Sequence, residues 1–590
     1  MTISNLSGFD AWRARLALVL IGLAWVLPFQ SPNFFAPISS FYGEAAAVVL
    51  GLAAMTCLYG RLAWPVIELP RSSLVFLGFA ALILLHVALG RTVYPQQNLL
   101  AILYLIWATA IAALAWRLRE IFGLETLATT LSWFALAGGL TSAAIGLVQL
   151  AGVSSPLQPF MLPQVNGRIY ANTGQPNHLA SYLCIGIASL TYLFGSGRIR
   201  MPTALAALAP LLIVLNVSGS RSVWLYLPAL VILAMFHRLL RPSPAASRIL
   251  LLSVLVCAGF LLVQWLAGIL VEPSGISVGA IGSRLHSQGM LSPVRFRLWH
   301  EAWLMFCDAP LFGQGFRQFP WQHFLLNAQL PPPRAEEVVN NNAHNLLLHT
   351  MGEFGLAGVV VLVAGLAFWL RGVWRNDFSA SMWWVLSLAV ILGIHSMLEY
   401  PLWYAYFLGI AAVVLGASES APTTIGKRTG GKLVRLLILL LGWIAVANIY
   451  QDYRTLQSLH RVPPLDANGE RQGPVAALLE LQQHSLFAPF VELALARTIV
   501  LDREQLGSKA ILNEAVMRFA PAPDVVYRQA VLLALDGQED SARAQWDLAV
   551  ANYPGERARM LQVLEAVASR EAIVTGLVTY AKTKVVKEAK

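Results

Sequence analysis

Residues 98–116 read NLLAILYLIWATAIAALAW, an uncharged run long enough for one helix to cross the hydrocarbon core of a bilayer. Arg117 and Arg119 follow this run directly. Apolar runs of similar length recur along the chain, and they predict about 13 membrane-spanning helices. The predicted spans lie near residues 15–32, 40–59, 72–90, 98–116, 126–151, 178–195, 202–219, 222–240, 248–271, 345–370, 382–398, 400–418 and 433–450.

The composition of the 590-residue chain agrees with this interpretation. Hydrophobic residues make up 57% of the chain and charged residues 12%, and a soluble domain carries about twice that charged fraction. The low charged fraction excludes a cytosolic globule. The high apolar fraction excludes a disordered chain, because disordered chains are poor in apolar residues. The four cysteines show no Cys/His ligand spacing, so we expect neither a zinc site nor a disulfide framework. No cofactor is predicted.

The basic residues predict the orientation of the chain. Pairs such as Arg117 and Arg119, or Arg371 and Arg375, fall at alternate ends of the predicted spans. The opposite ends carry single arginines or none, which is the positive-inside pattern and predicts a cytoplasmic N-terminus. The net charge of +10 therefore reflects topology and does not indicate nucleic-acid binding. An odd number of spans places everything after about residue 450 on the outer side.

Two segments on the predicted outer side are too long to be connectors. The long loop 272–344 belongs to a predicted transmembrane domain over residues 1–450, and residues 451–590 have the composition of a separate soluble domain. Residues 526–554 read as helix, Gly turn, helix and Pro, which resembles one tetratricopeptide unit. Helices from 475–520 would stack on it, either to dock a peptide or as a cap without a partner. The expected fold is thus all-α, polytopic, with a C-terminal helical domain.

Polar side chains at the predicted outer ends of spans are functional candidates, because such groups are costly near a membrane. Three clusters stand out: Gln175-Pro-Asn-His178, Ser218-Gly-Ser-Arg221-Ser222, and the long-loop residues Arg295, Arg297 and Asn340-Asn-Asn-Ala-His344-Asn345, followed by Glu353 in the next span. Purely structural roles are the alternatives. Asn177 would cap a helix, Arg221 would snorkel to lipid headgroups, and His344 would be a hydrogen-bonded structural residue.

The chemistry open to these clusters is limited. The chain has no Walker loop and no Asp-x-Asp-like metal pair. A synthetic enzyme outside the cytoplasmic membrane has no ATP, so its donor must arrive already activated. A lipid-linked sugar pyrophosphate meets this need, since arginines can stabilise its leaving group without a metal. A histidine can take the proton from an acceptor hydroxyl.

At these residues the chain resembles the bacterial O-antigen ligase and polymerase superfamily. Within it, the chain is most similar to the PglL-type protein O-oligosaccharyltransferases, which glycosylate pilins and other periplasmic proteins. The resemblance covers about residues 165–420 and is carried by Gln175-Pro-Asn-His178-Leu-Ala, Ser220-Arg221-Ser222, Arg295 four residues before Trp299, Pro310-Leu-Phe-Gly-Gln-Gly-Phe316, and Ala343-His344-Asn345-Leu with Glu353-Phe-Gly-Leu. The helical C-terminal domain resembles the one that the protein ligases carry.

The resemblance implies a multi-pass enzyme of the bacterial inner membrane with a periplasmic C-terminal domain. Its activity would be inverting, metal-independent transfer of an oligosaccharide en bloc from undecaprenyl-pyrophosphate to Ser or Thr hydroxyls of a periplasmic protein such as pilin. Its partners would be this donor, the acceptor protein and membrane lipids, with no nucleic acid. Arg221 and Arg295 would hold the pyrophosphate, and His344 would activate or orient the hydroxyl. The residues assigned to substrate binding are Gln175, Asn177, His178, Arg297, Asn345 and Glu353.

Two alternative functions stay open on the sequence. The first is glycan ligation to lipopolysaccharide core or glycan polymerisation, because ligases for different acceptors share these motifs. The second is a membrane transporter or lipid flippase. Transporters place polar residues near the bilayer midplane, whereas the candidates here gather at the predicted outer face and Glu44, His86 and His395 are scattered within spans.

Overall fold

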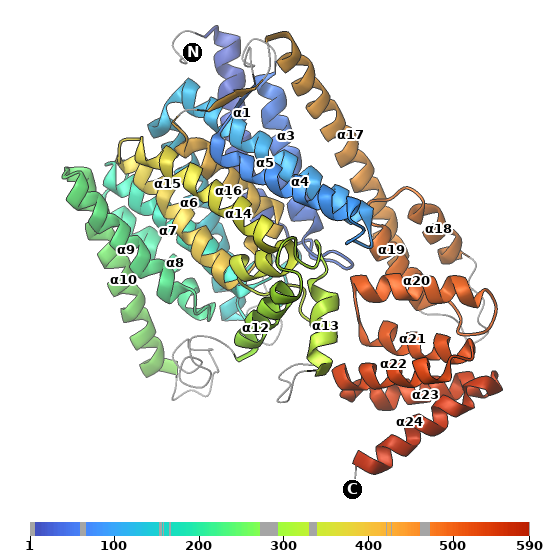
Figure 1. Cartoon of the computed structure of the whole chain (residues 1–590). Helices are drawn as coiled ribbons and strands as arrows, with labels where there is room; N and C mark the ends of the chain where they lie inside the picture. Colours follow the sequence, from blue (N-terminus) through green and yellow to red (C-terminus); the bar gives the residue numbers. More distant parts are fainter. Residues whose placement is uncertain are drawn as a thin grey trace. The chain divides into compact units, whose positions relative to one another are not determined.

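The computed structural model describes residues 6–59, 67–152, 156, 158–164, 167–271, 293–329, 339–420, 422–425, 428–460 and 473–588. These residues are almost entirely helical (Figure 1). Within the described ranges the strands are β1 (Ile67–Leu69) and β2 (Thr423–Ile425), which form one short antiparallel pair. The predicted all-α fold class is confirmed. Parts of the predicted long loop, 272–292 and 330–338, lie outside the described residues.

Every predicted span coincides with an apolar helix. Among the described residues, eleven helices are long and apolar enough to cross a membrane, and the shorter apolar helices α8 and α16 stand at the other two predicted spans. The helices are α1 (Gly8–Ala24) with α2 (Leu27–Gln30), α3 (Phe41–Leu58), α4 (Leu74–Ala88), α5 (Pro95–Phe122), α6 (Leu124–Ala151), α7 (Pro176–Gly195), α8 (Met201–Val217), α9 (Val223–Leu240), α10 (Pro244–Val271), α14 (Leu346–Trp374), α15 (Ala380–Leu398), α16 (Ala405–Ser418) and α17 (Arg428–His460).

Packing divides the chain into two compact units. The first comprises Met1–Phe79, Tyr104–Ser292 and Val361–Asn448, and the second comprises Ala80–Leu103, Pro293–Val360 and Ile449–Lys590. These groups differ from the predicted domains, because the helices of the long loop are grouped with the C-terminal helices. The division into a transmembrane and a soluble domain at residue 450 stays a prediction, as does the orientation in the membrane.

The first unit is a bundle of apolar helices around α7. All of α7 from His178 to Gly195 is buried, with α6, α8, α9, α10 and α15 packed against it. Small residues allow this close packing, since a Cβ added at Gly186 would lie 3.5 Å from the Cα of Gly139. Because neighbours surround α7, its first turn, which carries the Gln175–His178 motif, is held firmly in place.

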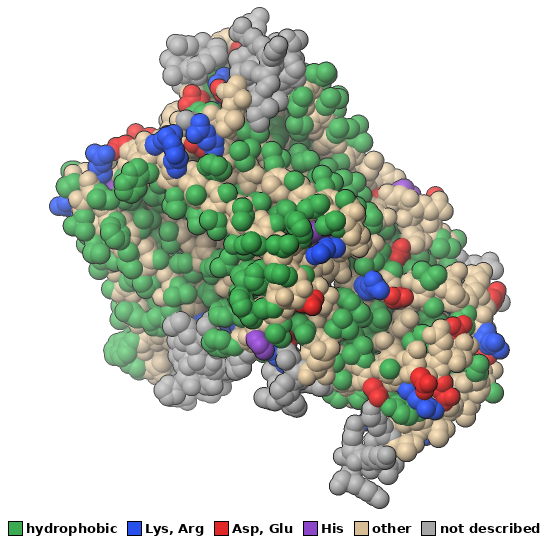
Figure 2. All heavy atoms as spheres, in the orientation of Figure 1, with side chains coloured by type: hydrophobic (Ala, Val, Ile, Leu, Met, Phe, Trp, Pro, Cys, Tyr) green, Lys and Arg blue, Asp and Glu red, His purple; other side chains and the backbone are tan. Residues whose placement is uncertain are grey.

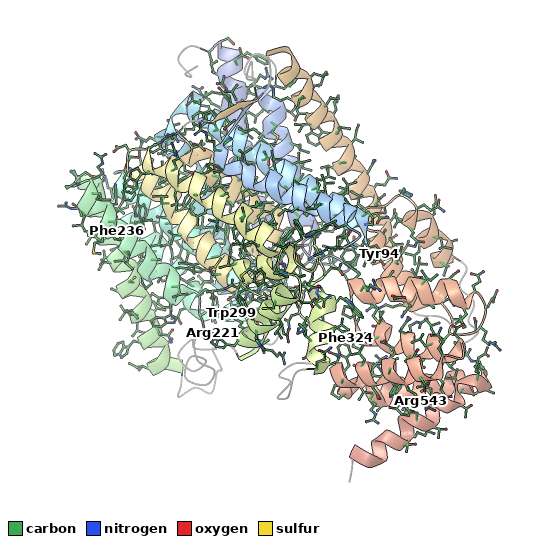
Figure 3. The ribbon with its side chains drawn as sticks, viewed as in Figure 1. Tyr94, Arg221, Phe236, Trp299, Phe324 and Arg543 are labelled. Carbon is green, nitrogen blue, oxygen red and sulfur yellow. The ribbon has the colours of Figure 1, made fainter. Side chains whose placement is uncertain are left out.

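The outer surface of this bundle is also apolar, and Figure 2 shows the apolar side chains over α9 and α10. On α9, Phe236 is 50% exposed (Figure 3), and on α10, Trp265 is 62% exposed. Water-soluble proteins rarely expose contiguous apolar surface on this scale, whereas lipid covers it without cost. The chain is therefore a multi-pass membrane protein.

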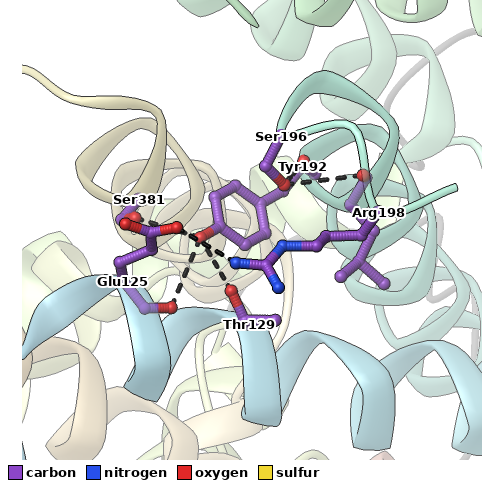
Figure 4. Close-up of polar contacts among 7 residues, drawn as sticks. Glu125, Thr129, Tyr192, Ser196, Arg198 and Ser381 are labelled. Carbon is purple, nitrogen blue, oxygen red and sulfur yellow. Dashed lines mark hydrogen bonds and ion pairs between the residues drawn. The ribbon is translucent and has the colours of Figure 1, made fainter. Parts of the chain in front are cut away.

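A polar cluster holds the other end of α7 (Figure 4). The hydroxyl of Tyr192 lies 3.2 Å from the Thr129 hydroxyl on α6 and 3.0 Å from the Ser381 hydroxyl on α15. Nearby, Arg198 forms an ion pair with Glu125 at 3.2 Å. These contacts tie three helices together at one level, so that the register of α7 is set at both ends.

The second unit contains two helices of the long loop, α12 (Pro293–Asp308) and α13 (Phe319–Gln329). It also contains a C-terminal stack formed by α18 (Gly473–Gln482), α19 (Ala488–Thr498), α20 (Leu506–Phe519), α21 (Pro523–Leu535), α22 (Glu539–Asn552), α23 (Arg557–Ala568) and α24 (Thr575–Glu588). The predicted helix–turn–helix over residues 526–554 corresponds to α21 and α22. Gly537 lies between them with φ 76°, a conformation that favours glycine. Tyr527 and Trp546 pack between the two helices, with ring centroids 4.9 Å apart.

Candidate functional site

In the first unit, Asn177 joins three segments that are distant in the sequence. Its Nδ2 donates to Glu399 Oε1 at 2.7 Å, and its Oδ1 accepts from the Ser220 hydroxyl at 2.7 Å. Glu399 follows α15 and is buried, and Ser220 lies in the turn between α8 and α9. The interpretation of Asn177 as a helix cap is wrong, because Gln175 occupies the cap position of α7. The amide instead fastens the turn beside Arg221 to the first turn of α7.

Arg221 lies in that turn and is partly exposed (Figure 3). The hydroxyl-bearing residues around it, Ser218, Ser220 and Ser222, are all buried. Gly219 has φ 69°, which lets the chain reverse within a few residues. The structure therefore presents the Arg221 guanidinium at the surface of the first unit, on a tight turn whose serine side chains are buried.

His178 is surrounded by aromatic rings. Its ring centroid lies 4.8 Å from that of Tyr404, 5.3 Å from that of Phe407 and 5.6 Å from that of His395. The side chain is buried. Gln175, three residues earlier, is partly exposed, and its carbonyl accepts from the Thr173 hydroxyl at 3.1 Å. In this position His178 holds the first turn of α7 against α15 and α16.

In the second unit, α14 is broken at Gly355, where φ is 61° and ψ is −154°. A break in a membrane helix frees backbone groups that must find partners. Here the loop Pro310–Gly315 supplies them. The amides of Leu356 and Ala357 donate to the carbonyls of Pro310 and Leu311 at 2.8 and 3.0 Å. In return, the amides of Gln314 and Gly315 donate to the carbonyls of Gly352 and Glu353 at 2.9 and 3.0 Å.

Two sequence motifs therefore form one backbone seam. The motif from Pro310 to Phe316 lies directly against the Glu353-Phe-Gly-Leu motif, and both approaches require glycine. A Cβ at Gly313 would lie 2.3 Å from the carbonyl carbon of Glu353, and a Cβ at Gly355 would lie 2.6 Å from the nitrogen of Gly313. The seam places the start of α14, and the residues just before it, in a defined position.

Replacing Gly355 with alanine is expected to destabilise the protein by about 3 kcal/mol or more, because this backbone region is essentially restricted to glycine. Gly393, in α15, is the matched control, since a Cβ there would meet nothing within 4 Å. Gly393→Ala should instead be neutral or stabilise by up to about 1 kcal/mol. Thermal unfolding of the purified membrane protein would measure both. Equal midpoints for the two variants would contradict the seam.

His86 holds the loop of the seam from the other side. Its Nε2 donates to the carbonyl of Phe312 at 2.9 Å, and its Nδ1 accepts from the amide of Phe316 at 3.0 Å. The ring is buried and stacks on Phe354 at 5.2 Å. Arg91 donates to the carbonyl of Gly313. The sequence offered no signal for this role, since 226 residues separate His86 from Phe312.

Glu353 lies buried in the first part of α14. Its Oε1 accepts from the amide of Phe319, the first residue of α13, at 3.1 Å. Its Oε2 lies 3.4 Å from His349 Nε2. The carboxylate therefore connects the beginning of α13 to the beginning of α14, and these contacts support the structural role considered for it.

His344 lies two residues before α14 and has φ 49°, a left-handed conformation that is uncommon outside glycine. Its amide donates to Asn342 Oδ1 at 2.9 Å, an Asx turn. Asn345 Oδ1 accepts from the amide of Leu348 at 3.1 Å and caps α14. The His344 side chain is partly exposed. Strained backbone that the surroundings hold in place clusters at functional sites.

Arg295 and His344 are both attached to one small core. Leu298, Ala302 and Met305 form the buried face of α12, and they pack with Phe319 and with Ala343, the residue before His344. Arg295 precedes Leu298 by one helical turn and is partly exposed, as is Trp299 (Figure 3). The second unit thus presents a guanidinium and an imidazole from two segments that pack on the same residues.

Arg297 has a different environment from Arg295. Its Nε lies 3.8 Å from Oε1 of Glu301, a carboxylate that is completely buried on the same helix. An arginine beside an internal carboxylate has less charge to offer a phosphate. This contact is a physical reason to rank Arg297 below Arg295 as a pyrophosphate ligand.

The structure distributes the predicted residues over both units. The first unit holds Gln175, Asn177, His178 and Arg221, and the second holds Arg295, Arg297, His344, Asn345 and Glu353. Sequence analysis missed Glu399, Glu301 and His323, all of them buried. A carboxylate directly after an apolar span, such as Glu399, was the available signal. In the part of the chain that the structure describes, no group of three or more His, Cys, Asp or Glu side chains is placed to hold a metal ion.

Comparisons with known proteins cover the same regions. Family models match for "Protein glycosylation ligase" over residues 169–194, for "O-Antigen ligase" over residues 206–363, and for "Virulence factor membrane-bound polymerase, C-terminal" over residues 383–567. The chain is also similar to a general O-oligosaccharyltransferase of Acinetobacter baylyi, with 24% identity over 545 residues and 90% of each chain covered. All the predicted site residues fall within the first two matches. These similarities, together with the membrane fold, show a glycosyltransferase, an oligosaccharyltransferase that is similar to the PglL-type protein glycosylation ligases and to the O-antigen ligases.

Proposed function

We propose that the chain transfers an oligosaccharide en bloc from undecaprenyl-pyrophosphate to Ser or Thr hydroxyls of a periplasmic protein, such as pilin, with inversion and without a metal. The relatives support a lipid-linked glycan donor and a protein acceptor. The observation that carries the proposal is the geometry of the second unit. His344 is held in a left-handed conformation next to a core that it shares with the helix bearing Arg295.

The proposed step is a single displacement at the anomeric carbon of the donor. The acceptor oxygen attacks this carbon from the face opposite the pyrophosphate, so that the new C–O bond forms as the bond to the pyrophosphate oxygen breaks. The imidazole of His344 takes the hydroxyl proton. The leaving pyrophosphate carries away the electron pair, and guanidinium groups stabilise the charge that develops on it. Arg295 is the first choice for this task, and Arg221 is the arginine of the first unit assigned to it.

An arginine suits the leaving group better than a lysine does. Its planar fork makes two parallel hydrogen bonds to phosphate oxygens, and it keeps its positive charge at every physiological pH. The charge that a metal would otherwise supply can therefore come from the protein. Transfer is accordingly expected to continue when divalent ions are removed with a chelator.

A transfer assay with purified components tests the proposal. The full-length protein in liposomes, with no ion gradient, receives undecaprenyl-pyrophosphate glycan and a candidate pilin, and glycopeptides are then mapped by mass spectrometry. We expect intact glycan on Ser or Thr with the anomeric configuration inverted. Glycan on lipopolysaccharide core alone, or lengthened glycan without modified protein, would overturn protein transfer.

A second function has specific support in the comparisons. The family models that match residues 206–363 and 383–567 describe an O-antigen ligase and a membrane-bound polymerase. Lipopolysaccharide ligation and glycan polymerisation would use the same donor and the same leaving group. They differ only in which hydroxyl attacks, so the assay above separates them by product.

A further inference from the structure

We propose that the C-terminal helical stack is a positioning element for the transfer site. It holds α13, and through α13 it holds the helix that carries Arg295 and the turn that carries His344. All the contacts involved lie within the second unit. The inference rests on the proposed function, because it concerns how these two side chains are kept in place.

One face of α13 is buried in the C-terminal stack. Phe324, which is labelled in Figure 3, is fully buried in the core of the stack. Its ring stacks on that of Tyr553 with centroids 6.3 Å apart. One helical turn later, Asn327 Nδ2 donates to Asn552 Oδ1 at 2.8 Å, and Asn552 Nδ2 donates to the carbonyl of Leu548 at 3.0 Å. Both asparagines are buried. The long loop thus completes the core of the stack and satisfies a polar group within it.

The opposite face of α13 is buried against α12. His323 Nδ1 lies 2.5 Å from Glu301 Oε2, and both side chains are almost completely inaccessible to solvent. The other oxygen of Glu301 faces Arg297. Phe319, one turn before His323, is fully buried among the α12 residues and Ala343. A buried carboxylate is costly unless it stays paired, so α12 and α13 are expected to move together or not at all.

The length of α13 makes the two faces interdependent. A helix of 11 residues is too short to be stable by itself in water. It exists because the stack covers one face and α12 covers the other. If the contacts with the stack are lost, the Glu301–His323 pair loses its support, and α12 and the residue next to His344 lose a packing partner.

Losing the contacts between α13 and the stack is expected to lower the rate of glycan transfer more than it weakens substrate binding. A misplacement of about 1 Å by a change far from the chemistry can cost roughly a hundredfold in rate. The left-handed backbone of His344 also persists only while its surroundings hold it. The surface of the stack that contacts α13 is covered by that helix. In this proposal the stack therefore affects the reaction through α13 and does not touch the substrate.

The test compares two buried asparagines of the stack. Asn552→Ala removes the bond to α13. Asn513→Ala is the matched control, because Asn513 is equally buried and its Nδ2 bonds to Val525 and Gln529 within the stack. We expect kcat for glycan transfer to fall roughly tenfold or more in Asn552→Ala, with KM for donor and acceptor nearly unchanged. In Asn513→Ala, kcat should stay within about twofold, and the stack should lose similar thermal stability.

Two further measurements keep the proposal falsifiable if Asn552→Ala folds poorly. Asn327→Ala removes the same hydrogen bond by changing its partner on α13, and it should lower kcat to the same extent. Hydrogen exchange of the full-length protein in detergent should become faster in α12 and α13 for both of these variants, and not for Asn513→Ala. Replacing Asn327 and Asn552 together by leucine restores an apolar contact and should recover most of the lost kcat.

Three results would overturn the positioning role of the stack. The first is an unchanged kcat in folded Asn552→Ala and Asn327→Ala. The second is an equal loss of kcat in Asn552→Ala and Asn513→Ala. A raised KM for the acceptor with unchanged kcat would instead assign this face to acceptor docking. If the wild-type protein transfers no glycan to protein, the proposed function fails. The hydrogen-exchange rates of α12 and α13 in the variants then still decide whether the stack holds these two helices in place.

Discussion

Replacing His344 with alanine is expected to reduce glycan transfer to protein by about 10²- to 10⁴-fold, the usual contribution of a general base. The protein should remain folded, because the side chain is partly exposed and because the His344 amide and Ala343 both help to anchor this turn. The measurement is the initial rate of glycopeptide formation with membrane-inserted protein at matched amounts. His484→Ala is the control, since that side chain is 60% exposed and lies in the C-terminal stack.

A second substitution at the same position separates proton transfer from backbone geometry. Asparagine tolerates the left-handed conformation and can hydrogen-bond to a hydroxyl, but it cannot take a proton from it. His344→Asn should therefore be nearly as inactive as His344→Ala if the imidazole is the base. Recovery of transfer by His344→Asn would limit the histidine to orienting the acceptor, and normal transfer by His344→Ala would remove it from the mechanism.

Replacing Arg295 with lysine is expected to lower kcat for transfer by about 10²-fold. The charge remains, but the planar fork that makes two parallel bonds to phosphate is lost. A loss of about 2.7 kcal/mol of transition-state stabilisation corresponds to that factor. The kinetics should be measured with varied lipid-linked donor, because a contact made mainly in the transition state lowers kcat more than it raises KM.

Arg297→Lys is the control for Arg295→Lys, since both arginines lie on α12 two residues apart. Lysine can keep the ion pair with Glu301, which lies 3.8 Å from the Arg297 guanidinium. We expect only a small change in transfer from this variant. If Arg297→Lys loses more activity than Arg295→Lys, the pyrophosphate contact belongs to Arg297 and the ranking drawn from Glu301 is wrong.

The positions of the apolar helices were predictable from the sequence to within several residues. Each predicted span coincides with a helix, including the two short ones, Met201–Val217 and Ala405–Ser418. The turn at Gly537 between two helices was also visible in the sequence. These features depend on neighbours within about 20 residues, because the transfer of an apolar segment into lipid depends on its own composition.

The candidate residues could be selected from the sequence because their motifs place unusual polar residues near predicted membrane edges, and their catalytic and binding roles stay predictions. Their partners were not predictable. Glu353 was assigned to substrate binding, and the structure joins it to His349 and the amide of Phe319. Asn177 was considered as a cap, and it bridges Ser220 and Glu399 instead.

The linear order of apolar and charged residues determined the all-α class, the spans and the candidate motifs of this protein, because hydrophobic length and charge act locally. Only the tertiary structure decided that the Pro310–Phe316 loop closes the break at Gly355, that His86 holds this loop, and that the C-terminal stack holds α13. The physical reason is that a freed backbone amide or a buried carboxylate must find a partner. Many distant groups could satisfy that need, and only folding brings one of them within hydrogen-bonding distance.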